Sequence, residues 1–171
     1  MSSDSGFLLH QNLLDEVSLI QKHFTKNHLT LSIAESCTGG FLSTCFTSFS
    51  GASAYFKGSL ITYSNESKIK FLDITKKDID KYGVASKYVV ELMAKNIQQK
   101  YNTDFSLATT GYVDGVGDKF TDCKDLHNYA WIAVSNRDFI YSKRLVLNSN
   151  RVENIHIVSL AALDMLRKEI I

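Results

Sequence analysis

Two polar segments carry the residue types from which a hydrolytic site could be built. The first, residues 34–40 (AESCTGG), places the hydroxyls of Ser36 and Thr38 beside the glycine pair that begins at Gly39. It stands between an expected strand and an expected helix, where backbone N–H groups can bind an anion or an oxyanion. The same composition also suits a helix cap with glycines for tight packing. The segment by itself leaves both interpretations open.

The second segment, residues 51–68 (GASAYFKGSLITYSNESK), contains a serine and a lysine on either side of an expected strand. A serine becomes a useful nucleophile beside a base, and a lysine can be that base once burial disfavours its charge. Folding could bring Ser53 and Lys68 together, with Tyr63 holding the lysine or relaying a proton. Alternatively, Lys68 is a solvated helix residue and Ser53 belongs to a turn.

The other candidates for chemistry are a thiol, a carboxylate and the imidazoles. Cys37 has no histidine near it in sequence, and the five histidines show no metal-ligand spacing. We therefore expect neither a cysteine nucleophile nor a metal site. Glu35 could orient Ser36 or bind substrate, and a structural role at the end of the strand explains it equally well.

Helices and strands alternate along the chain, and these elements must position the residues above. Apolar periodicity and cap residues predict helices at residues 8–26, 38–49, 65–72, 75–83, 86–101 and 150–170. Short apolar runs predict strands at residues 29–34, 56–62, 105–110, 129–135 and 139–147, with a long loop at 111–128. This alternation indicates one α/β layered domain, with an antiparallel pair near its C-terminal end.

Composition narrows the class of protein further. The 171 residues fit one domain, and a net charge of +1 gives no reason to expect nucleic acid or an anionic membrane as partner. Three cysteines cannot form a closed set of pairs, which favours a reducing compartment. With no signal segment and no apolar run long enough for a membrane span, we expect a cytoplasmic protein. Residues 1–7 are expected to be disordered.

Several runs, taken in order and spacing, resemble the CinA C-terminal-domain family, the nicotinamide mononucleotide deamidases. These runs are AESCTGG, GASAYFKGSLITYSNESKIKFLDI, YGVAS, ATTG and AWIAV, and the resemblance covers nearly the whole chain. It implies a single three-layer αβα domain with a mixed sheet over residues 1–171. It also implies hydrolysis of a small-molecule nucleotide amide to nicotinate mononucleotide and ammonia, without metal or cofactor, by a homodimer.

Carried over position by position, the resemblance assigns roles to individual residues. Ser53 matches the nucleophile, Lys68 the general base and Tyr63 the supporting hydroxyl. Arg151, at the start of the last helix, suits a phosphate. The residues expected to bind the substrate are Ser36, Thr38, Gly39, Thr110, Gly111 and Arg151.

The chain departs from the family pattern on the side expected to enclose the substrate. Where relatives have a loop of the form IAGPGG, Asp114 replaces a glycine and Gly115 replaces the proline. Two interpretations stay open: an active amidohydrolase, or a catalytically reduced nucleotide-binding or interaction protein. The combined presence of Ser53, Tyr63 and Lys68 favours the enzyme. We expect the charge of Asp114 to oppose a substrate phosphate.

Overall fold

The computed structural model describes residues 11–114 and 128–171, so the expectation for residues 1–7 lies outside the described range. The strands are β1 (Leu31–Glu35), β2 (Phe56–Ile61), β3 (Phe105–Tyr112), β4 (Asn128–Ser135) and β5 (Ile140–Leu147). The helices are α1 (Gln11–Lys26), α2 (Phe41–Thr47), α3 (Asn65–Leu72), α4 (Lys76–Tyr82), α5 (Lys87–Tyr101) and α6 (Arg151–Ile170), with a short 3₁₀ turn, η1, at Ala52–Ala54.

The five strands form one mixed sheet in the order β2-β1-β3-β4-β5. β1 pairs in parallel with both β2 and β3, whereas β3–β4 and β4–β5 are antiparallel. Parallel neighbours need a crossover, which α2 with η1 provides between β1 and β2, and the helices α3 to α5 provide before β3. The carboxyl ends of β1, β2 and β3 therefore meet at one edge of the sheet.

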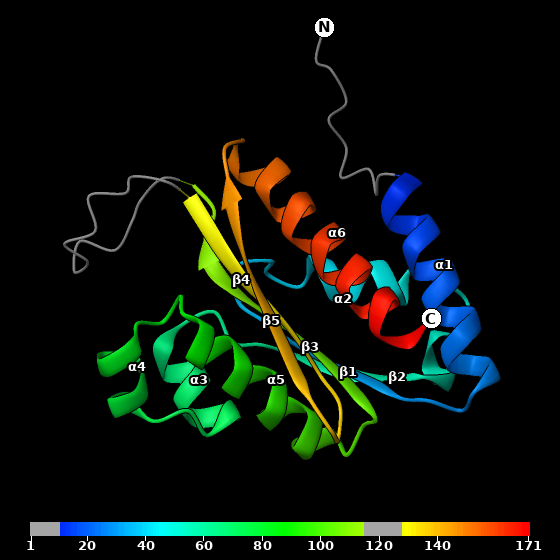
Figure 1. Ribbon diagram of the computed structural model, residues 1–171, viewed down its shortest axis with the longest axis horizontal. Helices are drawn as coiled ribbons and strands as arrows, with labels where there is room; N and C mark the ends of the chain where they lie inside the picture. Colours follow the sequence, from blue (N-terminus) through cyan, green and yellow to red (C-terminus); the bar gives the residue numbers. More distant parts are fainter. Residues whose placement is uncertain (1–10, 115–127) are drawn as a thin grey trace, which may run out of the picture.

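Helices cover both faces of the sheet. Figure 1 shows α1, α2 and α6 on one face and α3, α4 and α5 on the other. Alternate side chains of β1 enter the two cores: Leu31 and Ile33 pack with α1, α2 and α6, while Ala34 packs with α5. The three-layer αβα arrangement and the mixed sheet expected from the sequence are confirmed.

Local capping signals explain where the helices begin. Ser64, Thr75, Ser86 and Asn150 each accept a hydrogen bond from the backbone N–H three residues ahead. At α4 the capping box is complete, because the Asp78 carboxylate also accepts from the backbone N–H of Thr75. These helix starts follow the sequence prediction closely.

Gly111, Tyr112 and Asn128, which were expected in the loop at residues 111–128, belong to strands: the first two continue β3 and the third begins β4. Gly111 pairs with Ala130 of β4, and Tyr112 pairs with Tyr129. A Cβ on Gly111 would lie 2.5 Å from the Cα of Ala130, so a glycine permits this close pairing. Residues 115–127 lie outside the described range.

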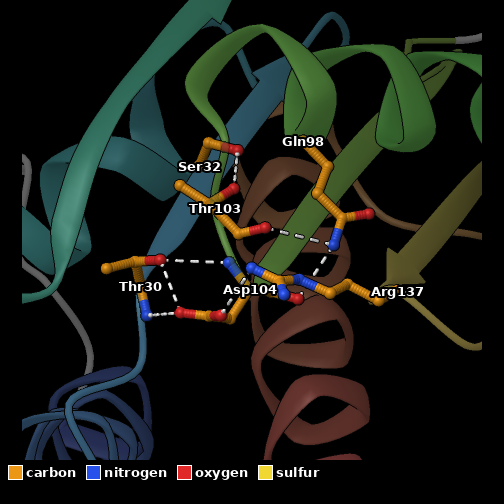
Figure 2. A network of polar contacts seen from close by, with 6 residues as sticks. All are labelled: Thr30, Ser32, Gln98, Thr103, Asp104 and Arg137. Carbon is orange, nitrogen blue, oxygen red and sulfur yellow. Dashed lines mark hydrogen bonds and ion pairs between the residues drawn. The ribbon is translucent and has the colours of Figure 1, made fainter.

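A polar network ties together the amino-terminal ends of β1 and β3 (Figure 2). The Asp104 carboxylate accepts from the backbone N–H and the hydroxyl of Thr30, at 2.9 and 2.7 Å. The hydroxyls of Ser32 and Thr103 share a hydrogen bond of 2.8 Å, and the Gln98 amide donates to the carbonyl groups of Thr103 and Asp104. Fixing these strand starts also fixes the register of the opposite ends, where the candidate site lies.

Candidate active site

A cavity of about 180 Å³ opens where β1, β2 and β3 end. Its lining comes from the start of the turn after β1, from three residues between 63 and 68, from Val84, from residues 110–114 and from the first residue of α6. In α/β sheets, ligands bind beyond the carboxyl ends of the strands, because loops and helix starts converge there. The cavity has the position expected for an active site.

Lys68 and Ser36 form a direct pair at the base of this cavity. The Lys68 side chain is fully buried, and its Nζ lies 2.9 Å from the Ser36 Oγ. The same Nζ donates to the backbone carbonyl of Thr62 at 2.6 Å and approaches that of Tyr63 at 3.4 Å. Ser36 is 7% exposed and lines the cavity, so a ligand can reach its hydroxyl.

The surroundings of Lys68 shift its protonation equilibrium toward the neutral form. Burial lowers the pKa of the Lys68 ammonium from 10.5 to about 8, with a smaller opposing effect from Cys37. A neutral amine has two N–H groups and one lone pair. The charged amine donates to the Ser36 Oγ and to the carbonyl groups of Thr62 and Tyr63. Once it loses a proton, its two remaining N–H groups can stay on the two carbonyl groups, and the lone pair can then accept the hydroxyl proton of Ser36. This is the arrangement that a general base needs beside a serine nucleophile.

The buried carboxylate of Glu35 holds the segment that carries Ser36. It accepts hydrogen bonds from the backbone N–H groups of Gly40, Leu42 and Ser43 at 3.0, 3.1 and 2.8 Å. The hydroxyls of Thr38 and Ser43 donate to it as well. The amides at the start of α2 are thus engaged by the chain's own carboxylate. Of the two interpretations left open for residues 34–40, the structure supports the capping segment.

Thr38 and Gly39 do not lie with the serine–lysine pair. The buried Thr38 hydroxyl donates to Glu35 at 2.6 Å and shares a hydrogen bond of 2.8 Å with Thr109. Together with Gly39 it lines a separate hollow over α2, next to Ile61. The structure therefore gives Thr38 a packing role at the strand ends, away from the cavity that contains Lys68.

Thr110 and Gly111 do line the cavity with Lys68, as expected. The Thr110 hydroxyl donates to the carbonyl of Val84 at 3.0 Å, which fixes the turn between α4 and α5 against the end of β3. Thr110 is 1% exposed, so its contribution to the cavity is a wall held in place by that bond.

Tyr63 and Arg151 meet at the mouth of the cavity. Arg151 donates one hydrogen bond to the Tyr63 hydroxyl at 2.7 Å and another to the Asp114 carboxylate at 2.6 Å. The bond to Tyr63, and then that to Asp114, raise the pKa of the Arg151 guanidinium. The sequence predicted all three residues at the substrate, but not that Arg151 would bind the other two.

The chain does not bring Ser53 to Lys68, in contrast to the expected pairing. Ser53 is exposed in η1, before β2 begins, whereas Lys68 contacts Thr62, after β2 ends. Six strand residues rise about 3.3 Å each, so these positions lie roughly 20 Å apart. The two residues flank the same strand, and the strand itself separates them.

Sequence reasoning could have found the Ser36–Lys68 pair from topology. A strand, a helix and a second strand in succession indicate parallel strands, and residues that follow parallel strands share one edge. Ser36 follows β1, and Thr62 follows β2. Nothing in the sequence indicated that Asn154 would join α6 to the end of β3, because the Val113 carbonyl to which it donates is 41 residues away.

Cys37 also lines the cavity, but its thiol is poorly suited to nucleophilic attack. Burial raises the pKa of Cys37 from 9.0 to about 12. A thiol with that pKa is almost entirely protonated at neutral pH. The expectation that Cys37 is not the nucleophile stays a prediction, and this environment supports it.

The residues that the structure describes, 11–114 and 128–171, also bear on the class of site. Within these ranges no three His, Cys, Asp or Glu side chains come together in a group that could hold a metal ion. None of the helices in the same ranges is long and apolar enough to cross a membrane.

The fold and the site together define an α/β domain with a small pocket at its strand ends. Residues 15–170 match the family model described as the CinA C-terminal domain. A CinA-like protein of Flavobacterium psychrophilum is 37% identical over 153 residues, which cover 90% of this chain and 36% of that protein. A CinA-like protein of Shewanella baltica (strain OS155) is 40% identical over 144 residues, which cover 84% of this chain and 33% of that protein. The chain belongs to the CinA C-terminal-domain family.

Solved structures show the same fold. Competence damage-inducible protein A (ComA) from Klebsiella pneumoniae superposes with a TM-score of 0.85 at 21% identity, covering 93% of this chain and 97% of that one. Competence/damage inducible protein CihA from Agrobacterium tumefaciens gives 0.86 at 24% identity, with 94% and 97% covered. The chain spans about a third of the length of the two curated relatives described above.

Proposed function

We propose that the chain is a serine amidohydrolase in which Ser36 is the nucleophile and Lys68 the general base. One observation carries the proposal: a fully buried lysine amine lies 2.9 Å from a serine hydroxyl that faces a cavity. The two backbone carbonyl groups next to the amine orient it, as a third member orients the base in a catalytic triad.

The reaction proceeds in two steps through an acyl-enzyme. The Ser36 Oγ attacks the amide carbon while its proton passes to the Lys68 amine. The tetrahedral intermediate then breaks its C–N bond, Lys68 returns the proton to the leaving nitrogen, and ammonia departs. In the second step, Lys68 takes a proton from a water that attacks the Ser36 ester, and the carboxylic acid product is released as that proton returns to Ser36. The acid then loses its remaining proton to the solvent.

The substrate that we propose is a nicotinamide nucleotide or a close relative of it. The resemblance of the site segments to those of the nicotinamide mononucleotide deamidases supports this choice. The cavity also supports it, because about 180 Å³ is less than whole ligands usually occupy and suits the amide-bearing end of a larger molecule. Tyr63 and Arg151 at the mouth then face the remainder of the substrate.

The test is ammonia release from nicotinamide mononucleotide, nicotinamide riboside and nicotinamide by the wild type and two serine variants. Ser36→Ala is expected to lower kcat by at least about a thousandfold, because removal of a nucleophile leaves only the background rate of the site. Ser53→Ala is the matched control, and we expect it to keep wild-type activity. Thermal unfolding of each variant checks that the fold is intact.

The two serines decide between the assignments. An active Ser36→Ala variant with an inactive Ser53→Ala variant would show that the nucleophile is Ser53. Binding of the nucleotides without ammonia release by the wild type would instead support the nucleotide-binding function that the sequence left open.

A further inference from the structure

An ion pair between Arg151 and Asp114 lies at the mouth of the cavity. Arg151 is the cation that was expected to bind a substrate phosphate, and here it binds a carboxylate of the chain itself. The Arg151 Nη1 donates to the Asp114 Oδ2 at 2.6 Å, and the two side chains are 41% and 44% exposed. An ion pair with this exposure adds little to stability. Its importance lies in the charge that a ligand meets at the mouth, where the carboxylate offsets the guanidinium.

The backbone on both sides of this pair is fixed by one buried side chain. Asn154, in the first turn of α6, donates to the Val113 carbonyl at 2.8 Å and to the Ser149 carbonyl at 2.7 Å, and accepts from the Ser149 N–H at 3.2 Å. Val113 is itself 2% exposed. Because Asp114 follows the anchored Val113, and Arg151 lies one turn before Asn154, the fold places the two charges together.

The ion pair is also connected to the catalytic pair. Arg151 donates to the Tyr63 hydroxyl at 2.7 Å, and the backbone carbonyl of Tyr63 lies 3.4 Å from the Lys68 Nζ. Asp114, Arg151 and Tyr63 all line the same cavity as Ser36 and Lys68. A substrate whose amide lies at Ser36 therefore directs its opposite end toward Asp114 and Arg151.

We propose that Asp114 is a specificity-determining residue that makes the site prefer an amide without a phosphate, such as a nicotinamide nucleoside, over the corresponding mononucleotide. This proposal rests on the proposed function for the location of the amide. A phosphate at the mouth would have to displace the carboxylate from Arg151 or bind beside a like charge, whereas sugar hydroxyls can donate hydrogen bonds to the carboxylate.

The test compares two ligands that differ only in the phosphate, nicotinamide riboside and nicotinamide mononucleotide, by isothermal titration calorimetry on the full chain. Measurements use the wild type, Asp114→Asn, which removes the charge, and Asp114→Glu, which keeps it. Asp138→Asn, in the exposed turn between β4 and β5 at the other end of the sheet, is the control for net charge. Initial rates of ammonia release are recorded in parallel.

We expect wild type to bind the riboside more tightly, and Asp114→Asn to shift the ratio of the two affinities toward the mononucleotide by about tenfold at low salt. Asp114→Glu and Asp138→Asn should keep the wild-type ratio. An unchanged ratio in Asp114→Asn, or binding of neither ligand to either protein, would overturn the assignment of Asp114. If Asp114→Asn shifts the ratio of the two affinities but neither the wild type nor any variant releases ammonia, the role of Asp114 in ligand selection stands. The proposed amidohydrolase activity would then be refuted.

Discussion

If Lys68 is the general base, its pKa should control the pH dependence of catalysis. Burial lowers that pKa from 10.5 to about 8, and this corresponds to about 3 kcal/mol of free energy against the charged form. At pH 7 roughly one molecule in ten then carries the neutral amine, compared with roughly one in 3,000 at the ordinary pKa. The fold thus raises the concentration of usable base by about two orders of magnitude at neutral pH.

The expected pH profile follows from this value. Below pH 8, kcat/KM for ammonia release should rise about tenfold per pH unit as the lysine loses its proton, and it should level off above pH 8. The Cε resonance of Lys68 in ¹³C NMR should titrate near pH 8 in the same protein without substrate. The spectroscopic titration keeps the prediction testable whatever the substrate is.

The lowered pKa of Lys68 should also make the free energy of unfolding depend on pH, and the direction of that dependence can be worked out. Below pH 8 the folded and unfolded states both hold the proton, so the cost of the buried charge is fully present. Between pH 8 and 10.5 only the unfolded state holds it, so the free energy of unfolding should rise with pH by up to about 3 kcal/mol from this group. Urea unfolding of Lys68→Met should lack this rise.

Two variants test whether the pH dependence comes from Lys68 and not from another lysine. Lys70→Met removes an exposed lysine of the same helix and should leave both the rate and the pH profile unchanged. Lys68→Arg keeps a positive charge that cannot be lost at these pH values, and we expect it to be inactive throughout. A rate that does not vary between pH 6 and 8, or an active Lys68→Arg, would refute the role of Lys68 as base.

Three further outcomes test the structure around the site. Glu35→Gln should lower the free energy of unfolding in urea by about 2–4 kcal/mol. The amide would have to point its own NH₂ group at backbone N–H groups that now donate to the carboxylate. An unchanged midpoint of urea unfolding would contradict that network. Cys37→Ser should keep most of the activity, and the wild-type thiol should resist alkylation at pH 8 in the folded state, whereas rapid labelling would contradict its raised pKa. Gly111→Ala should destabilise the fold by about 1–3 kcal/mol in thermal unfolding, since its Cβ would lie 2.5 Å from the carbonyl oxygen of Tyr129; wild-type stability would show that β3 and β4 can separate there.

The elements of this protein could be read from the sequence because their signals are local. Cap residues and apolar spacing act within one or two helical turns, so α3 begins and ends at the residues predicted, and Asn150 caps α6 as expected. The family could be read for a similar reason, since short runs such as AESCTGG keep their order and spacing along the chain. Local chemistry therefore predicted the fold class and the segments that carry the site.

Only the tertiary structure decided which of these residues meet. Ser53 and Lys68 flank one strand, and the length of that strand keeps them apart, whereas the parallel pairing of β1 with β2 brings Ser36 to Lys68. The pairing of Arg151 with Asp114 likewise depends on α6 packing against the end of β3 through Asn154. Contacts across 32 to 41 residues are set by strand direction and helix packing, and these are properties of the whole fold that no short run of sequence contains.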